Sequence, residues 1–339
     1  MKYKAYIGTY SERYSEGIYF TEFDSETGVM KILDTWSIPS PAYLTISEGI
    51  LYSVQETRQL KGHYGGGVAS FTIGPDGSLT QLSSKWTWGS MPCHVQHYPK
   101  GKKLFVTNYV DGTLTMFNVE KGILGELTLF KHSGSGPDER RQKGPHAHSS
   151  QFDPHSERIA VADLGTDKVV FYNLADMMSH AGTLSTDGGC GPRHMAFSKN
   201  KPYAWVLCEM SNEVYAFETK SGKRIGVYST LPKDFKEVTH CAAIKLSADE
   251  KRLYASNRGH DSIACFDINL NTGALSLNTI FPTGGKTPRD FGISPDGAYL
   301  YAANQESDNI LVYKMENGIP KGNAVSELKI PCPVCVVFN

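Results

Sequence analysis

The chain has 339 residues, a net charge of −1 at neutral pH, 40% hydrophobic residues and 20% charged residues. These values fit a soluble globular protein, and so small a net charge gives no reason to expect binding to nucleic acid or to an anionic membrane. No apolar run approaches the roughly 18 residues that suggest a membrane-spanning helix. The first ten residues, MKYKAYIGTY, lack the apolar core of a signal peptide, so we expect a cytoplasmic protein.

One structural unit recurs along the chain. It consists of a Pro-rich or Gly-rich lead-in, an apolar strand, a turn, a second apolar strand that ends in a polar residue or a substitute, a polar turn, and a third strand with aromatic residues. The first copy, at YIGTY, has no lead-in strand of its own. In chain order, the later copies begin at SPAYLTI, MPCHVQHY, GPHAHSSQF, GPRHMAF, HCAAIKL and TPRDFGI.

The spacing between the ends of successive second strands gives the length of the repeat. They fall at Thr9, Val54, Asn108, Asp163, Cys208, Asn257 and Asn304. Successive ends are 45 to 55 residues apart, a period that holds about four short strands and is typical of β-propeller blades. We therefore predict an all-β fold, a seven-bladed β-propeller with four-stranded antiparallel blades, formed by a single domain over residues 1–339. The C-terminal segment PCPVCVVFN would supply the missing strand of the first blade, so that pairing of the N- and C-terminal strands closes the ring.

Antiparallel pairing decides where the polar residues of each blade lie. The first strand begins and the second strand ends at the same end of a blade, so residues just before the one and just after the other crowd one edge. The turns at the opposite end, such as SPDG and YPKG, have ordinary turn chemistry. The edge predicted by this rule instead carries His94, His146, His148, Arg193, His194, Glu209, Arg258, Arg289 and Gln305.

A single charged residue at such a turn more often satisfies the turn than performs catalysis. Asp163 and Asp261 are expected to bond backbone amides in this way, and His132 is expected at the surface. The convergence of several cationic and titratable groups on one edge is the stronger signal. It favours a shared binding site for a small anion.

Seven segments, in order along nearly the whole chain, carry a resemblance to a known family. They are YIGTY at 6–10, GPHAHS at 144–149, DLGTDKV at 163–169, GPRHMAF at 191–197, SNRGHDSI at 256–263, PRDF at 288–291 and NQESDNI at 304–310. In these segments the sequence resembles the seven-bladed-propeller lactonases of the bacterial 6-phosphogluconolactonase type, a family that also includes fungal muconate-lactonizing enzymes. One departure is CEM at 208–210, where the family usually has an Asn-Glu-Leu type triplet, but the glutamate is kept.

The resemblance implies an activity and an active-site cluster. The implied activity is hydrolysis of 6-phospho-D-glucono-1,5-lactone to 6-phosphogluconate, a step of the oxidative pentose phosphate pathway and of glucose metabolism. The implied catalytic residues are His146, Arg193, Glu209 and Arg258. The substrate itself stays open, because the family contains both hydrolases and a cycloisomerase.

Opening a lactone ring requires an activated water, a stabilised oxyanion and a grip on the substrate. The chain has no GxSxG motif, so direct attack by water is the simpler hypothesis. His146 is the preferred general base, with Glu209 orienting it, acting as an alternative base, or pairing with an arginine. Arg193 and Arg258 would stabilise the oxyanion of the tetrahedral intermediate.

A phosphorylated sugar lactone also needs a site for its dianion, and arginine side chains suit phosphate oxygens. The candidate substrate-binding residues are His148, His194, Arg289, Lys143 and Gln305. The polar loop of residues 132–149 either folds over the site as a lid or is a mobile surface loop. We expect no cofactor.

Three alternatives stay open. The histidines and Glu209 would suit a divalent metal, but nearby arginines oppose a cation and no tight ligand set stands out beyond His146 and His148, so no metal is predicted. The same residues would also serve a lactonase or cycloisomerase acting on another small anionic lactone. A non-catalytic propeller that binds proteins is the alternative outside enzymes, although the chain lacks regular WD signatures and no protein partner is indicated.

Overall fold

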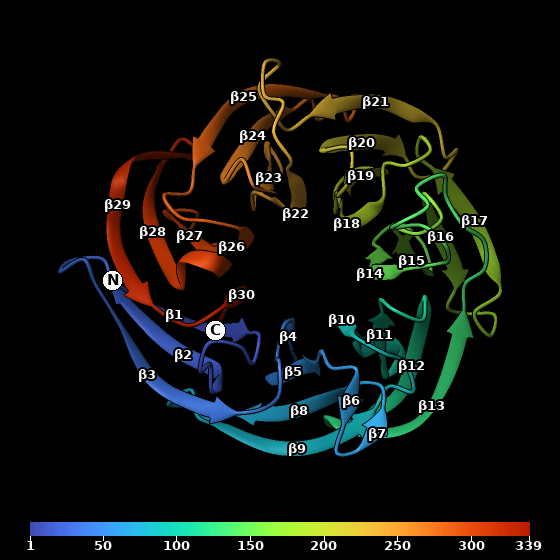
Figure 1. Cartoon of the computed structure of the whole chain (residues 1–339), viewed down its shortest axis with the longest axis horizontal. Helices are drawn as coiled ribbons and strands as arrows, with labels where there is room; N and C mark the ends of the chain where they lie inside the picture. The colour runs from blue at the N-terminus through green and yellow to red at the C-terminus, as the bar shows by residue number, and fades with distance from the viewer. The chain divides into compact units, whose positions relative to one another are not determined.

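The computed structural model describes residues 1–339, whose strands form seven four-stranded antiparallel sheets and one two-stranded hairpin (Figure 1). Two short 3-10 turns, η1 (Pro99–Gly101) and η2 (Gln305–Ser307), are the only helical segments. None of the chain's helices has the length and apolar character that crossing a bilayer requires. The chain divides into two compact units. Unit 1 contains Met1–Val106, Thr115–Leu129 and Thr283–Asn339, and unit 2 contains Thr107–Leu114 and Phe130–Pro282.

Unit 1 contains three complete sheets, with strand orders β3-β2-β1-β30, β4-β5-β8-β9 and β26-β27-β28-β29, and the hairpin β6-β7. Their bounds are β1 Lys2–Thr9, β2 Gly17–Asp24, β3 Val29–Ser37, β4 Leu44–Ser47, β5 Ile50–Gln55, β6 Gln59–Leu60, β7 His63–Tyr64, β8 Gly67–Ile73, β9 Leu79–Trp86, β26 Pro288–Ile293, β27 Tyr299–Asn304, β28 Asn309–Glu316, β29 Ile319–Lys329 and β30 Pro333–Phe338. A further sheet has strands that are divided between the two units. It consists of β10 Pro92–Tyr98, β11 Lys103–Asn108, β12 Thr113–Glu120 and β13 Ile123–Lys131.

Unit 2 contains three consecutive sheets, each built from four strands in chain order. The first consists of β14 Ala147–Asp153, β15 Arg158–Asp163, β16 Lys168–Asn173 and β17 His180–Ser185. The second consists of β18 Pro192–Phe197, β19 Tyr203–Cys208, β20 Glu213–Glu218 and β21 Arg224–Ser229. The third consists of β22 His240–Leu246, β23 Arg252–Arg258, β24 Ser262–Ile268 and β25 Leu275–Pro282.

The repeat predicted from the sequence is confirmed at the level of the sheets. Each predicted end of a second strand lies at the end of a strand or one residue before it, as at Asn108 in β11 and Asn257 in β23. The prediction of seven four-stranded antiparallel sheets is therefore correct. The prediction that residues 1–339 form one domain stays a prediction.

The sheets of unit 2 pack face to face through alternating side chains of β19. Ala204, Val206 and Cys208 belong to the buried cluster shared with the preceding sheet. Trp205 and Leu207 belong to the cluster shared with the following sheet. Because side chains alternate along a strand, one apolar segment fills two interfaces, and this explains why the middle strands are apolar on both faces.

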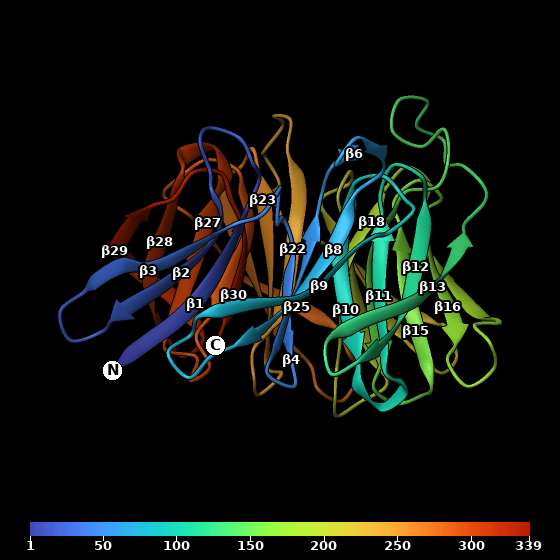
Figure 2. The ribbon, with the colours of Figure 1, turned by 90° about the horizontal axis from the view of Figure 1, so that it is seen from below.

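The C-terminal strand completes the first sheet, as predicted. In unit 1, β30 pairs antiparallel with β1, and the register joins Ala5 with Phe338 and Ile7 with Val336. The two strands lie side by side in both views of the chain (Figures 1 and 2). Val336 is buried in a cluster that also contains Tyr301.

We expect deletion of Pro333–Asn339 to abolish cooperative folding of unit 1. The deletion removes buried Val334, Cys335 and Val336 and leaves β1 with an open edge. At about 1.5–3 kcal/mol for each buried side chain, the loss is roughly 5–9 kcal/mol, comparable to the whole stability of a typical domain. The measurement is thermal unfolding followed by circular dichroism, with deletion of the exposed Asn339 alone as the control. An unchanged unfolding midpoint in the longer deletion would contradict this account.

Candidate active site

β-Bulges in the first strands of the sheets set the direction of several candidate side chains. In unit 2 the ladder between β14 and β15 has its irregularity at His148, and the ladder between β18 and β19 has its irregularity at Arg193. In unit 1 the ladder between β26 and β27 has the same feature at Arg289. A bulge leaves one residue out of the pairing and redirects its side chain, and bulges are frequent beside active sites.

Glu209 is the centre of an ion-pair cluster in unit 2. It follows the last residue of β19, and its carboxylate pairs with three arginine side chains. Glu209 Oε1 lies 2.7 Å from Arg141 Nη2, while Oε2 lies 2.9 Å from Arg193 Nε and 2.9 Å from Arg258 Nη2. The side chain of Arg193 is only 3% exposed, whereas Arg258 is 15% and Arg141 is 35% exposed. A ligand from solvent is therefore able to contact Arg258 and Arg141, the two more exposed arginines.

The arginines keep Glu209 ionised. Burial alone would raise the pKa of this carboxyl, but the positive charges of Arg258 and Arg193 hold its pKa well below the usual range. His148 and the hydrogen bond from Arg141 act in the same direction. A carboxylate with so low a pKa is a weak base, so this environment favours a role for Glu209 in holding the arginines.

The cluster contains more positive than negative charge. Three guanidinium groups and one carboxylate give these four side chains a net charge of +2, three minus one. Backbone carbonyl groups of Cys241 and Ala242 accept hydrogen bonds from Arg258 and Arg193 and hold both side chains in place. Half-buried cations in excess of their counter-charges are costly in free energy, so the arrangement suits an anionic ligand.

His146 lies directly before β14 and contacts Tyr109. Its Nδ1 lies 2.8 Å from the backbone oxygen of Tyr109, and the two rings stack with centroids 4.6 Å apart. A carbonyl oxygen only accepts hydrogen bonds, so Nδ1 carries the hydrogen and the neutral ring keeps its lone pair on Nε2. The carboxylate of Asp163 accepts a hydrogen bond of 2.8 Å from the backbone N–H of His146. The local structure thus selects the tautomer that a general base requires.

A chain of contacts connects Tyr109 with the arginine cluster. The Tyr109 hydroxyl accepts a hydrogen bond of 3.2 Å from Arg141, and the Tyr109 ring lies 5.4 Å from that of His148. The rings of His148 and His194 are also 5.4 Å apart, and His194 Nε2 lies 3.1 Å from Arg193 Nη1. The structure thus brings together the predicted residues His146, His148, Arg193, His194, Glu209 and Arg258.

Arg141 and Tyr109 are members of the cluster that sequence analysis missed. Arg141 belongs to the loop of residues 132–149, which contains the basic segment ERRQK. The buried side chain of Gln142 donates a 2.8 Å hydrogen bond to the Asp167 carboxylate and anchors this loop. Tyr109 directly follows the predicted strand end at Asn108. Antiparallel pairing places residues that follow a second strand at the same edge as the candidate residues, so this reasoning would have included Tyr109.

Three predicted substrate-binding residues are not part of the described contacts of the cluster. Lys143 is exposed on the loop that contains Arg141. Arg289 and Gln305 belong to unit 1, where the guanidinium of Arg289 lies 5.0 Å from the ring centroid of Tyr10 and the backbone oxygen of Gln305 accepts a hydrogen bond from Arg13. Their part in substrate binding stays a prediction.

The expectation for His132 is wrong, because this side chain is buried. Its Nδ1 lies 2.7 Å from Asp163 Oδ2, and its ring lies 5.9 Å from that of Tyr172. The polar residues that follow it suggest a surface loop, but His132 itself comes directly after β13 and packs inward. Asp163 bonds the backbone amide of Gly165, as expected of a turn residue.

The cysteines near Glu209 are poor nucleophiles. All seven cysteines of the chain are free and buried. Burial raises the pKa of Cys241 to about 12 and raises that of Cys208 as well, so both thiols stay protonated at neutral pH. No three or more His, Cys, Asp or Glu side chains of the chain are grouped so that they could hold a metal ion.

Comparison with known proteins gives one family over almost the whole chain. The family model for "Lactonase, 7-bladed beta-propeller" matches residues 4–338, in agreement with the seven four-stranded sheets. The 6-phosphogluconolactonase of Bacillus subtilis is 34% identical over 349 aligned residues, which cover 99% of this chain and 98% of that protein. The 6-phosphogluconolactonase of Formosa agariphila is 33% identical and covers 92% of both chains. The solved structure of a periplasmic gluconolactonase from Pseudomonas aeruginosa has a TM-score of 0.93 and 29% identity, and covers 100% of this chain and 99% of that one.

We expect Glu209→Gln to destabilise the protein by about 3–5 kcal/mol at neutral pH, because the substitution leaves buried arginine charges without their shared carboxylate. Since the pKa of Glu209 is lower in the folded than in the unfolded state, its contribution is complete above the ordinary value of 4.5 and is lost as pH falls through the folded-state pKa. The difference in free energy of unfolding between wild type and variant should therefore shrink below pH 4.5. Urea denaturation across pH measures it.

The exposed Glu237 supplies the control for this experiment. Glu237→Gln should change the free energy of unfolding by no more than about 0.5 kcal/mol at any pH, as is usual for surface substitutions. A Glu209→Gln variant as stable as this control would show that the arginines do not depend on the carboxylate.

Proposed function

Because the chain belongs to the family of seven-bladed β-propeller lactonases, enzymes that hydrolyse the ester bond of a lactone ring, we propose that its substrate is 6-phospho-D-glucono-1,5-lactone and its product 6-phosphogluconate. Two relatives that cover most of the chain bear the name of this activity. The proposal places the protein in the oxidative pentose phosphate pathway.

The observation that carries the proposal is the cluster of Arg141, Arg193 and Arg258 around Glu209. A phosphorylated lactone presents a phosphate dianion, and it develops a second negative centre when water adds to its carbonyl carbon. Arg193 is the most buried and the most constrained of the three, since Glu209, the Ala242 carbonyl and His194 all contact its guanidinium. Arg193 therefore fixes Glu209, and Glu209 in turn holds the more exposed Arg258, which would serve as a preorganised donor for the oxyanion, an interaction typically worth about 3–4 kcal/mol.

Arg141 suits the phosphate group of the substrate, as Arg258 suits the oxyanion. Both keep part of their side chain exposed while one end is fixed on Glu209. Guanidinium groups match phosphate oxygens in charge and in geometry. Anchoring on Glu209 reduces the conformational entropy that each arginine would lose when it binds the substrate.

His146 is the proposed general base. Its Nδ1–H is committed to the Tyr109 carbonyl, so Nε2 accepts a proton from the attacking water while the hydroxide oxygen bonds to the lactone carbonyl carbon. Collapse of the tetrahedral oxyanion breaks the bond between the carbonyl carbon and the ring oxygen. The imidazolium then returns its proton to that oxygen, and the products are a carboxylic acid and a free hydroxyl group.

A second substrate requires a direct comparison, because the Pseudomonas aeruginosa structure is described as a gluconolactonase and 6-phosphogluconolactone differs from gluconolactone by its phosphate. The assay is the rate of ring opening of each lactone above its spontaneous hydrolysis, with and without EDTA. We expect the larger kcat/KM for the phosphorylated lactone and no effect of EDTA. Equal kcat/KM values for both lactones would show that the enzyme does not recognise the phosphate. Loss of activity in EDTA would support a catalytic metal ion.

Arg141→Ala tests the proposed phosphate contact, with Arg140→Ala as the matched control. Arg140 is the adjacent arginine of the same loop and is exposed. We expect Arg141→Ala to lower kcat/KM for the phosphorylated lactone about tenfold or more, a change of about 1.4 kcal/mol, and to have a smaller effect on gluconolactone. Steady-state kinetics on both lactones measure this. A similar loss on both would assign Arg141 to positioning Glu209 instead.

His146→Asn tests the general base. The amide of asparagine is able to donate a hydrogen bond as Nδ1–H does, but it has no basic nitrogen. We expect kcat to fall by about 10²–10⁴-fold with little change in KM, and added imidazole to restore part of the activity. An intact kcat would exclude His146 as the base.

A further inference from the structure

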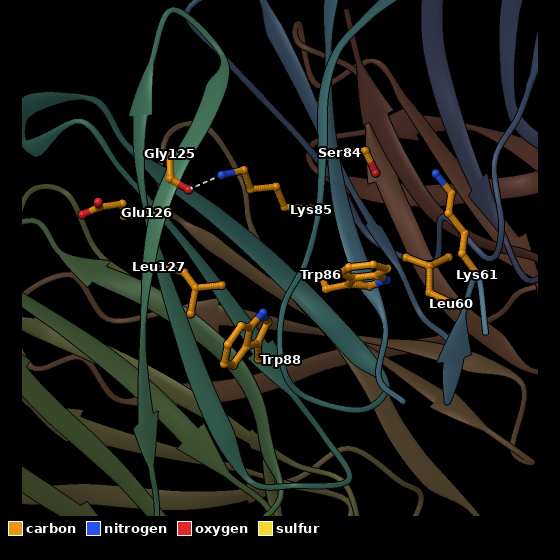
Figure 3. Close-up of a pocket in the computed structure, with 9 residues that line it drawn as sticks. All are labelled: Leu60, Lys61, Ser84, Lys85, Trp86, Trp88, Gly125, Glu126 and Leu127. Atoms are coloured by element: carbon orange, nitrogen blue, oxygen red, sulfur yellow. Dashed lines mark hydrogen bonds between the residues drawn. The ribbon is translucent and has the colours of Figure 1, made fainter. Parts of the chain in front are cut away.

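An open hollow lies on the surface of unit 1 between the outer strands β9 and β13 (Figure 3). Its volume is about 460 Å³, within the usual range for small-molecule sites. Trp86 and Trp88 form its aromatic part, and Leu60 and Leu127 lie to either side of them in the close-up. We call it the tryptophan groove. None of its residues belongs to the candidate active site.

The backbone of Trp88 is held in an unfavourable conformation that keeps its side chain at the surface. Its backbone φ is 59°, in the left-handed region that bulky residues seldom adopt, and its side chain is 71% exposed. The preceding Thr87 is fully buried, and its hydroxyl bonds the backbone oxygens of Gly66 and Gly89 and so fixes the turn. A conformation of this kind persists where the surroundings enforce it, and the turn fixed by Thr87 does so here. The turn therefore exposes the indole ring of Trp88 to solvent, although its backbone conformation is unfavourable.

The exposed aromatic surface extends beyond the groove. A second hollow of about 400 Å³ shares both tryptophans and is lined also by His63 and Tyr64 of β7. Tyr64 is 66% exposed, and the ring of His63 lies 4.5 Å from that of Trp86. Space on more than one side of the two indoles is thus open to a ligand longer than one ring.

We propose that the tryptophan groove binds a saccharide, with a pyranose ring stacked on the indole of Trp88. One face of a pyranose presents C–H groups that pack on an aromatic ring, while its hydroxyl groups point outward to polar partners. The groove supplies such partners in Lys61, Ser84 and Lys85, of which the serine hydroxyl both donates and accepts. Lys85 Nζ is already held at the wall by a 2.7 Å hydrogen bond to the Gly125 carbonyl (Figure 3).

The same polar groups argue against an apolar protein partner. Covering two lysines with apolar surface would remove their hydration without replacing it. The groove is lined by nine residues, whereas a stable protein interface uses about 20–30 residues on each side. A polyhydroxylated ligand of a few rings matches both the size and the polarity.

Calorimetric titration with maltose and with cellobiose tests the proposal, and mannitol serves as an open-chain polyol without a ring. We expect saturable binding of at least one disaccharide to the wild-type protein and none of mannitol. Two of the chain's four tryptophans line the groove, and Trp205 is buried. Adding the disaccharide should therefore also shift the intrinsic tryptophan fluorescence, measured in a separate titration. Lactone hydrolysis should not change on addition of the disaccharide.

Trp88→Gly is the decisive variant. Glycine adopts a positive φ without strain, so the thermal unfolding midpoint should be equal to or above that of wild type, while disaccharide affinity falls at least tenfold. Tyr14→Ala removes another exposed aromatic side chain, 99% exposed and outside the groove, and should bind as wild type does. Lack of saturable binding of both disaccharides to the wild-type protein, or undiminished affinity in Trp88→Gly, would overturn the proposal. So would a wild-type dimer that Trp88→Gly dissociates in sedimentation, because the groove would then be an interface between two copies.

Discussion

The carboxylate of Glu209 holds together the side chains of the candidate site. Its partners come from three places in unit 2: Arg141 from the loop before β14, Arg193 from β18, and Arg258 from β23. One buried anion therefore ties together elements of three consecutive sheets. Ion pairs at this depth contribute little net stability, since desolvation offsets much of the attraction. Their value here is geometric, because they keep two partly exposed guanidinium groups in fixed positions.

The site assigns proton transfer and the positioning of the arginines to different residues, although a carboxylate and a histidine are both able to act as a base. The positive surroundings of Glu209 keep its pKa low and so remove it from proton transfer. His146 has no part in the ion pairs, and its tautomer is selected by the Tyr109 carbonyl while Asp163 holds its backbone. Two titratable groups in different environments can thus take different roles within one site.

Much of this arrangement could be predicted from the sequence, because antiparallel pairing obeys a simple rule. The start of a first strand and the end of a second strand must meet, and the rule therefore predicts that Arg193 and Glu209 lie at the same edge. The rule places residues on strands and says nothing of loops, which explains why it missed Arg141. It also could not anticipate the inward packing of His132, which depends on the Asp163 carboxylate of another strand.

The bulges explain why the rule succeeds for side chains as well as for the backbone. His148, Arg193 and Arg289 occupy the same irregular position in three different sheets. In a regular strand, alternate side chains point into the apolar interfaces with the two neighbouring sheets, where an unpaired charge would be costly in free energy. Repetition of the bulge lets a fold made of apolar strands carry cations at equivalent positions, and substitutions at these positions can vary the chemistry while the sheets stay the same.

The pairing of β1 with β30 has a consequence for how the protein is made. β1 precedes every other strand of the structure and its partner β30 follows all of them, so the first sheet is completed only after β30 has been synthesised. Until then β1 exposes an unpaired edge, and the contact that covers it spans almost the whole sequence. Contacts of such long range slow folding and prolong the time during which nascent chains are able to associate wrongly. The N-terminal sheet is accordingly the part of this protein that most needs protection during translation.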